Sequence, residues 1–378
     1  MVSIAQMMKV MPDGYENACY STKAIVRKRG VTSAGDLMML SMFHLINGCS
    51  LLEISEIARL AKLGDMSDVA FMNRFEKCGD WFKWIAAKMK TTGMANYEKP
   101  EYLAPYSVLG VDASDVTEKG RSARTWRLHY ALDIFEMCSK LYKITEQNVG
   151  ETLLNFEFEP HQLVVADRIY STINGMKHCT ERKADYILRM RANSFSLYDE
   201  DGKRVNILDS LSDLKGDGCA DISLYAGNLS GERMPIRICG MRKSPEAIAQ
   251  TVKKLRRKES KKQQKVSTET KTFNEYIVVV TSLPIDITAE QVLETYRLRW
   301  QIEIQFKRMK SILDFGEIPK RRSSSVMTWL NGKLMLALVI ERIISTAFSP
   351  EEQSTSIEEF MAGNEMVETD FDNKCYEL

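Results

Sequence analysis

The chain has 378 residues, of which 44% are hydrophobic and 27% are charged, and this is enough for two or three folded domains. Its net charge of +1 excludes a protein that is basic throughout. Eight cysteines without a C-x-x-C pair argue against a zinc site and a disulfide framework. No secretory signal is visible at the start, and the apolar run at 334–340 is too short to span a bilayer. We therefore expect a cytoplasmic protein with no membrane partner.

Helices are predicted from residue 33 to about residue 92. Ser50 and Glu53 have the spacing of an N-terminal capping box, and the apolar pattern that follows is predicted to end at Gly64. Ser67 is placed to cap the next helix. Two short helices joined by a glycine-containing turn are typical of a helix-turn-helix, and many helical bundles share the pattern. The sequence leaves both interpretations open.

Short apolar segments predict a sheet from about residue 100 onward. Strands and helices follow one another in an order that mixes antiparallel and parallel pairing. Two of the strands end in an aspartate, Asp112 and Asp167. The predicted strands are 106–112, 125–134, 140–145, 161–167 and 185–191, with helical segments near 150–158 and at 171–183.

Residues 194 to about 275 have short, polar strands broken by glycine, and then a strongly basic run, KKLRRKESKKQQK, at 253–265. We expect these residues to form an insertion in the core. The basic run is interpreted either as a mobile strap that contacts nucleic acid or as a solvated linker. A buried strand at 275–283 returns to the core, and an acidic tail begins at Glu351.

One glutamate, Glu303, stands among basic and aromatic residues in the segment YRLRWQIEIQFKRMK, which we predict to be part of one helix capped by Thr288. At about 100° per residue, the polar side chains fall within an arc of about 80°, and a buried stripe lies beside it. Gln301, Gln305 and Arg308 are expected to face water. On this pattern alone, a solvated surface is as well supported as a site for an anion and a metal. The polar arc contains Tyr296, Arg299, Glu303, Lys307 and Lys310, and the stripe contains Leu298, Ile302, Phe306, Met309 and Leu313.

Three carboxylates carry the chemistry that we expect. Asp112 and Asp167 at strand ends, with Glu303 on a later helix, would meet in a crevice at the edge of the sheet. Converging carboxylates repel one another without a cation, and oxygen ligands favour magnesium or manganese. Two such ions about 4 Å apart support phosphoryl transfer on a polynucleotide. An aspartate that closes a strand is more often part of a turn, and Asp115 or Asp133 could be mistaken for the ligand.

Four of these residues carry a family resemblance. Tyr296, Arg299, Glu303 and Lys310 fit the spacing Y-x2-R-x3-E-x6-K, which resembles the YREK signature of a large group of bacterial insertion-sequence transposases. GVDAS, RLHYALD and VVADRIY are similar to the family's two aspartate regions, and the resemblance extends from about residue 24 to 345. The chain departs from the family at Ala113 and Ile169, where glycine is often found.

The resemblance implies a DDE transposase with a mixed α/β fold: a ribonuclease-H-like catalytic core with a β-rich insertion, preceded by an α-helical N-terminal domain. Two Mg²⁺ or Mn²⁺ ions would be held by Asp112, Asp167 and Glu303. Tyr296, Arg299, Lys307 and Lys310 would contact DNA. The implied partners are terminal inverted repeats and target DNA, bound by a homodimer associated with the nucleoid.

Changes of sequence texture, together with this resemblance, divide the chain into five parts. These are a helical DNA-binding region at 1–99, the first part of the core at 100–193, the insertion with the basic run at 194–274, the last part of the core at 275–346, and the acidic tail at 347–378. Two other functions fit less well: a catalytically silent transposase-derived DNA-binding protein, and a ribonuclease-H-like nuclease without strand transfer.

Overall fold

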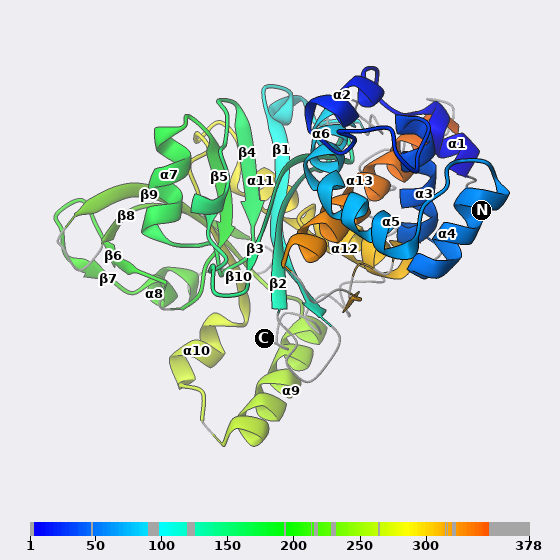
Figure 1. The fold of residues 1–378 in the computed structure, drawn as a ribbon. Helices are drawn as coiled ribbons and strands as arrows, with labels where there is room; N and C mark the ends of the chain where they lie inside the picture. The colour runs from blue at the N-terminus through cyan, green and yellow to red at the C-terminus, as the bar shows by residue number, and fades with distance from the viewer. Residues whose placement is uncertain are drawn as a thin grey trace.

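The computed structural model describes residues 4–347, apart from 47, 90–97, 119–124, 193, 213, 215–217, 228–231, 264, 314, 316 and 320–322. The predicted mixed α/β class is confirmed, because one large sheet is combined with helices, most of which gather in a domain at one side (Figure 1). The acidic tail lies outside the described residues. No described helix is long and apolar enough to cross a membrane.

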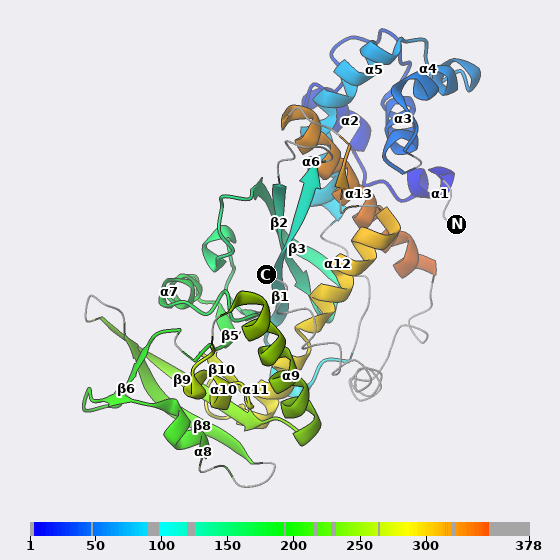
Figure 2. The same ribbon diagram turned by 90° about the horizontal axis from the view of Figure 1, so that it is seen from below.

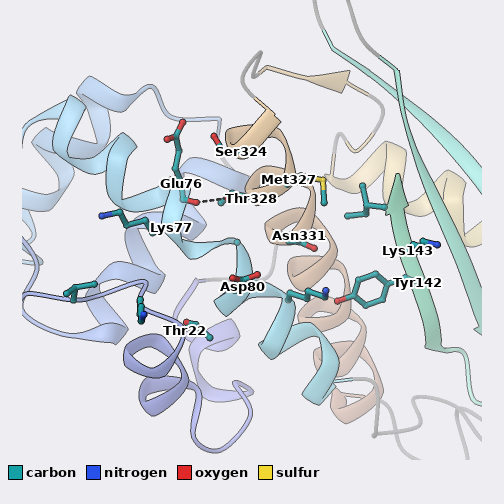
Figure 3. A pocket seen from close by; sticks show the side chains of 15 residues that line it. Thr22, Glu76, Lys77, Asp80, Tyr142, Lys143, Ser324, Met327, Thr328 and Asn331 are labelled. Atoms are coloured by element: carbon teal, nitrogen blue, oxygen red, sulfur yellow. Dashed lines mark hydrogen bonds between the residues drawn. The ribbon is translucent and has the colours of Figure 1, made fainter. Parts of the chain in front are cut away.

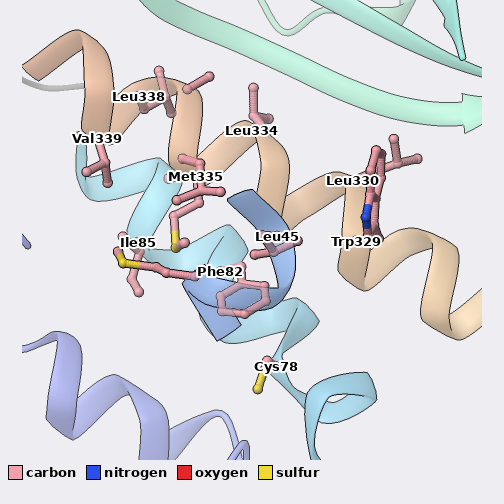
Figure 4. Close-up of a cluster of buried hydrophobic side chains, with 14 of the residues drawn as sticks. Leu45, Cys78, Phe82, Ile85, Trp329, Leu330, Leu334, Met335, Leu338 and Val339 are labelled. Carbon is pink, nitrogen blue, oxygen red and sulfur yellow. The ribbon is translucent and has the colours of Figure 1, made fainter. Parts of the chain in front are cut away.

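The helical domain is built from the start of the chain and from its last helix. A long helix near the C-terminus, α13, packs along α6 (Figure 1), and their contact buries leucine, isoleucine, methionine and phenylalanine side chains (Figure 4). The segment predicted as the end of the catalytic core thus also completes the helical domain. The helices are α1 (Ile4–Lys9), α2 (Tyr15–Ser21), α3 (Ala34–Ile46), α4 (Leu51–Leu60), α5 (Asp68–Phe75), the 3-10 turn η1 (Glu76–Cys78), α6 (Gly79–Met89) and α13 (Ser323–Ala347).

The predicted helix starts are confirmed, and one predicted helix end is wrong. Ser50 and Glu53 form the capping box of α4, and the Ser67 hydroxyl accepts from the backbone of α5. However, α4 ends at Leu60, because Lys62 adopts the left-handed conformation with φ 57°. Gly64 serves a different purpose, since a Cβ there would lie 2.0 Å from the carbonyl oxygen of Gly30.

The half of the sheet that carries Asp112 and Asp167 is centred on β1, which pairs antiparallel with β2 and parallel with β4. All five predicted strands are found. Two expectations are wrong: the segment near 150–158 holds only a 3-10 turn, η3 (Leu153–Asn155), and Asp112 lies inside β1, which continues six residues further. The elements are β1 (Ser107–Glu118), β2 (Thr125–Asp133), β3 (Cys138–Glu146), η2 (Glu101–Leu103), β4 (Gln162–Ala166), α7 (Ile173–Glu181) and β5 (Asp185–Arg189).

The residues predicted as an insertion extend the same sheet. Strand β10 pairs antiparallel with both β5 and β9, so the sheet runs β3-β2-β1-β4-β5-β10-β9-β8-β6-β7, with β11 beside β1. Two helices, α9 and α10, project from the body (Figure 1). These elements are β6 (Ser196–Tyr198), β7 (Arg204–Val205), α8 (Ile207–Ser212), β8 (Cys219–Gly227), β9 (Arg233–Arg242), α9 (Pro245–Lys262), α10 (Thr268–Phe273), β10 (Tyr276–Thr281) and β11 (Glu317–Ile318).

The basic run is a helix over most of its length, which corrects the expectation of a mobile strap or linker. Ser244 caps α9 and Pro245 occupies its first turn, a position that proline favours. Leu255 is buried on one side of α9, whereas Lys253 and Arg257 are exposed on another. The basic charge is therefore carried on one face of an ordered helix.

The helix predicted to carry Glu303 is broken into α11 (Ala289–Arg297) and α12 (Trp300–Leu313). Thr288 caps α11 and not the helix of Glu303. At the break the backbone turns more tightly, because the Arg299 amide donates to the Tyr296 carbonyl over 3.1 Å, three residues back. Tyr296 and Glu303 consequently lie on different helices.

The predicted apolar stripe is confirmed as buried, but two residues expected in water are buried as well. All five stripe residues are at most 7% exposed. Gln301 and Gln305 are only 3% and 5% exposed, and the Gln305 amide donates to Glu341 of α13. Arg308 is exposed, as predicted. The helical periodicity predicted the apolar stripe. It could not predict the burial of Gln305, because this residue packs against α13, which comes later in the chain.

Candidate active site

Asp112 and Asp167 are placed by the point at which β4 ends. The parallel pairing of β1 with β4 runs up to Val111 and Ala166, and each aspartate is the next residue. Beyond this point β1 continues beside β2, with Asp112 opposite Tyr130. The two aspartates therefore lie side by side where the sheet opens between β1 and β4, which is the kind of place where ligands of α/β sheets bind.

Glu303 approaches from α12, which runs alongside β1 toward the helical domain (Figure 2). A glycine in β1 permits the close approach, because an added Cβ at Gly110 would already lie 3.5 Å from the Cβ of Ile302. Ile302 precedes Glu303 in the chain. Burial is the main cause of the raised pKa of Asp112, and the negative charge of the nearby Glu303 adds to it.

A buried arginine neutralises this acidic group. The Arg299 side chain is 1% exposed, and its Nη2 lies 2.5 Å from Oε1 of Glu303. Burial by itself lowers the pKa of Arg299, but the neighbouring Tyr296, Asp167, Glu303 and Asp112 raise the pKa well above its ordinary value. Arg299 is therefore a permanent cation among the three acids, and it is not on the exposed face expected from the helical pattern.

The two aspartates have different electrostatic surroundings. Burial raises the pKa of Asp112 to about 7, against the opposing effects of Arg299 and of the Ala113 amide, which donates to Asp112 Oδ1 over 2.8 Å. Burial also raises the pKa of Asp167, but Arg299, Arg168 and Arg189 outweigh it, and the pKa of Asp167 lies below its ordinary value. Asp167 is consequently charged at neutral pH, whereas Asp112 is near its midpoint.

The other predicted DNA contacts are divided between the interior and the surface. Tyr296 is 3% exposed and close to Arg299. Lys307 and Lys310 are exposed on α12, one and two turns beyond Glu303. The structure therefore brings five of the seven predicted site residues together and leaves two lysines at the margin.

Tyr170 belongs to the site and was not predicted from the sequence. It is fully buried, its hydroxyl has no hydrogen-bond partner among the described residues, and burial together with Asp112, Glu151 and Asp167 raises its pKa well above the ordinary value. The available signal was its position, three residues after Asp167 in VVADRIY. Glu151 also lies near Asp167, and Oε1 of Glu151 is 3.5 Å from Nη2 of Arg127.

The donor set fits a hard divalent cation. Asp167 Oδ1 is buried without a hydrogen-bond partner among the described residues, and Arg168 Nε is 3.7 Å away. Carboxylate oxygens are the ligands that magnesium and manganese prefer. Within the part of the chain that the structure describes, no three acidic, histidine or cysteine side chains form a ready-made metal cluster.

Comparison with known proteins identifies the family of the chain. The family described as Transposase DDE domain matches residues 105–340, more than half of the chain. A putative transposase InsL of insertion sequence element IS186A from Escherichia coli K12 is 26% identical over 358 residues, covering 92% of this chain and 95% of the relative. The transposase of insertion sequence element IS421 from Escherichia coli is 26% identical over the same shares. The transposase of IS1151 from Clostridium perfringens is 41% identical over 78 residues, 21% of this chain and 16% of the relative.

The chain belongs to the transposase DDE domain family. It is an insertion-sequence transposase, an enzyme that cleaves DNA and transfers the cut strand. The core that carries Asp112 and Asp167 accordingly has the ribonuclease-H-like arrangement of this family, whose members generally use divalent metal ions.

Proposed function

We propose that this transposase cuts the ends of its insertion sequence and joins them to target DNA, with Asp112, Asp167 and Glu303 as ligands of two divalent ions, Mg²⁺ or Mn²⁺. The observation that carries the proposal is the convergence of the three partly buried acids around one fully buried arginine. Bound there, the two ions would activate a water or a 3′-hydroxyl and stabilise the leaving oxygen.

We propose that Arg299 has two positions in the reaction cycle. Without metal it neutralises the acids, and with metal bound it turns toward the DNA phosphate beside them. An arginine can hold a phosphate through two parallel hydrogen bonds. Tyr296 would support the guanidinium from α11, while Lys307 and Lys310 would contact the flanking backbone as point charges. These roles correspond to the YREK subgroup of the family.

We propose that DNA outside the cut site is held by the helical region and by α9. A basic segment, 27–29, is tied to α5 through Arg74 Nη2, which donates to the carbonyls of Arg27 and Arg29 over 3.3 and 2.6 Å. The exposed side of α9 presents Lys253, Arg256 and Arg257. Both surfaces suit phosphate contacts, and binding of two element ends together would involve a homodimer.

The decisive experiment replaces each acid by its amide. Asp112→Asn, Asp167→Asn and Glu303→Gln should each abolish Mg²⁺- or Mn²⁺-dependent cleavage of DNA that carries an element end, with DNA binding retained. Asp115→Asn is the matched control, because Asp115 lies nearby in β1 but is bound to Arg127 at 2.7 Å.

Three outcomes would argue against the proposal. Wild-type rates in any one acid variant would remove that residue from the ligand set. Specific DNA binding by the wild type without cleavage would favour the silent DNA-binding protein. Cleavage without joining to target DNA would favour a nuclease.

A further inference from the structure

A groove of about 650 Å³ lies where the helical domain, α13 and the edge strand β3 meet (Figure 3). Its walls come from segments far apart in the sequence: the end of α2 and the following loop, the start of α6, the middle of β3 and the first turns of α13. The lining contains Thr22, Lys23, Val26, Glu76, Lys77, Gly79, Asp80, Lys83, Tyr142, Lys143, Ile144, Ser324, Met327, Thr328 and Asn331. None of the predicted site residues lines it.

The rim of the groove is basic. Four exposed lysines come from three different walls, and no ion pair is made by Lys23, Lys77 or Lys83 with any described residue. Of the two acids in the lining, Glu76 accepts a hydrogen bond from the hydroxyl of Ser325. The remaining excess of positive charge suits an anion with several negative groups.

The floor of the groove is apolar and aromatic. Tyr142 extends from β3 toward α13 (Figure 3), and it lies with Ile144 and Met327, all three partly buried. Asn331 is 8% exposed and adds an amide at the base. A floor of this kind favours a flat, partly apolar group with hydrogen-bonding edges, and a simple inorganic anion would leave it unused.

We propose that this groove binds a segment of unpaired DNA, with its phosphates on the lysine rim and its bases against Tyr142 and the apolar floor. Basic grooves with aromatic side chains are the usual means of binding single strands. A double helix keeps its bases stacked inside, so it would touch the rim alone. The proposal rests on the proposed function, because the cutting of an element end is what exposes unpaired strands.

The register of the sheet relates the groove to the acids. Asp112 pairs with Tyr130, and Tyr130 pairs with Tyr142, so the three side chains form a row on one face of three adjacent strands. Two strand spacings amount to about 10 Å between the first and last backbone positions. The groove, which α13 lines, is thus next to the face of the sheet that carries the acids.

The test measures the binding of two labelled DNA probes by groove variants and by matched control variants, without divalent metal. One probe is a single strand of about 12 nucleotides, within the site sizes of single-strand binders, and the other is the corresponding duplex. Lys77→Gln with Lys83→Gln should weaken single-strand binding and lower the slope of log affinity against log salt by about 1.4, since each phosphate contact contributes about 0.7. Lys9→Gln with Lys183→Gln, two exposed lysines elsewhere, should change neither.

A second variant tests the floor. Tyr142→Leu should weaken single-strand binding roughly 5- to 150-fold, the range of base stacking on one aromatic ring, and leave duplex binding unchanged. Tyr225→Leu is the control, because Tyr225 is also a partly buried strand tyrosine. Thermal melting of all variants separates lost binding from lost folding.

Four results would overturn the proposal. Unchanged single-strand affinity and salt slope in the lysine variant would show that the groove is not the binding site. A loss of single-strand affinity that parallels a lowered melting temperature of the variants would show the same. An equal loss of duplex binding would assign the groove to the backbone of a double helix. Binding of polyglutamate, but not of the single strand, that depends on Lys77 and Lys83 would assign it to an acidic protein segment. Metal-dependent cleavage by the wild type is measured separately, so a failure of the groove is distinguishable from a failure of the proposed function.

Discussion

At the scale of single residues, the site is organised around Arg299. Three acids surround it, and its Nη2 donates a hydrogen bond to Oε1 of Glu303 over 2.5 Å. A buried charge that loses its partner is strongly destabilising. The metal-free protein therefore depends on this arginine for stability as well as for catalysis.

Arg299→Gln should lower the stability of the metal-free protein by roughly 3–5 kcal/mol, because the buried carboxylates lose their cation. Added Mg²⁺ or Mn²⁺ should recover much of this loss, so that the metal raises the melting temperature more in the variant than in the wild type. Arg308→Gln, exposed on the same helix, is the control. Identical melting of Arg299→Gln and wild type in EDTA would contradict the role of counter-ion.

Tyr170 can be separated from the ligands by removing its hydroxyl alone. Because that hydroxyl has no partner among the described residues, Tyr170→Phe should leave the metal-free melting temperature unchanged or slightly higher. If the hydroxyl orients an aspartate for metal binding, Mn²⁺ affinity measured by calorimetry should fall about tenfold. Tyr186→Phe, a buried tyrosine of β5, provides the comparison. Reduced metal-free stability with unchanged affinity would indicate a packing role.

At the scale of elements, local patterns were predicted well and their interruptions were not. The caps at Ser50, Ser67 and Thr288 are set by residues three positions away, so the sequence contains all the information. The break between α11 and α12 and the burial of Gln305 depend on packing against β1 and α13, which are distant in the chain. The short apolar runs before Asp112 and Asp167 predicted the two strands, but β1 continues past Asp112 instead of ending there.

The contact between α12 and α13 should make stability depend on pH. Burial raises the pKa of Glu341 to about 8, and Gln305 and Arg308 of α12 only partly oppose this, while Tyr130 of β2 lies close by. The folded protein favours the uncharged form of Glu341, because the pKa of this carboxyl group is higher in the folded than in the unfolded state. The stability that Glu341 contributes is therefore complete below about pH 4.5 and is lost as pH rises toward 8.

Glu341→Gln should remove this dependence, since an amide cannot ionise. The variant should gain stability relative to wild type as pH rises, on the order of a few kcal/mol at pH 8 and near zero at pH 4.5. Urea unfolding across this range gives the difference directly and cancels the contributions of other groups. A constant difference at all pH values would show that Glu341 does not titrate on unfolding.

At the scale of the whole molecule, the helical domain and the catalytic sheet share one apolar core. Buried residues of α3 and α6 pack with those of α13, and the same cluster continues through α12 to the inner face of β2. The predicted boundary near residue 99 follows a change of sequence texture, but the core crosses it. The sequence could not predict this shared core, because α13, the helix that completes the helical region, begins more than 200 residues after α6 ends.

A fragment of residues 1–99 should consequently fail to fold alone, since it lacks α13, and circular dichroism should show no cooperative melt. In the full chain, Leu334→Ala should lower stability by about 2–5 kcal/mol, because Leu334 is fully buried between the two parts. Leu60→Ala, at a leucine that is 78% exposed, should change it by less than about 0.5 kcal/mol. If the fragment melts cooperatively, or if the two leucine variants are equally stable, the helical region is an independent domain and α13 only lies against it. The shared core favours the opposite result, in which α13 is an integral part of the helical region and, through the contact of Glu341 with Gln305, holds the helix of Glu303.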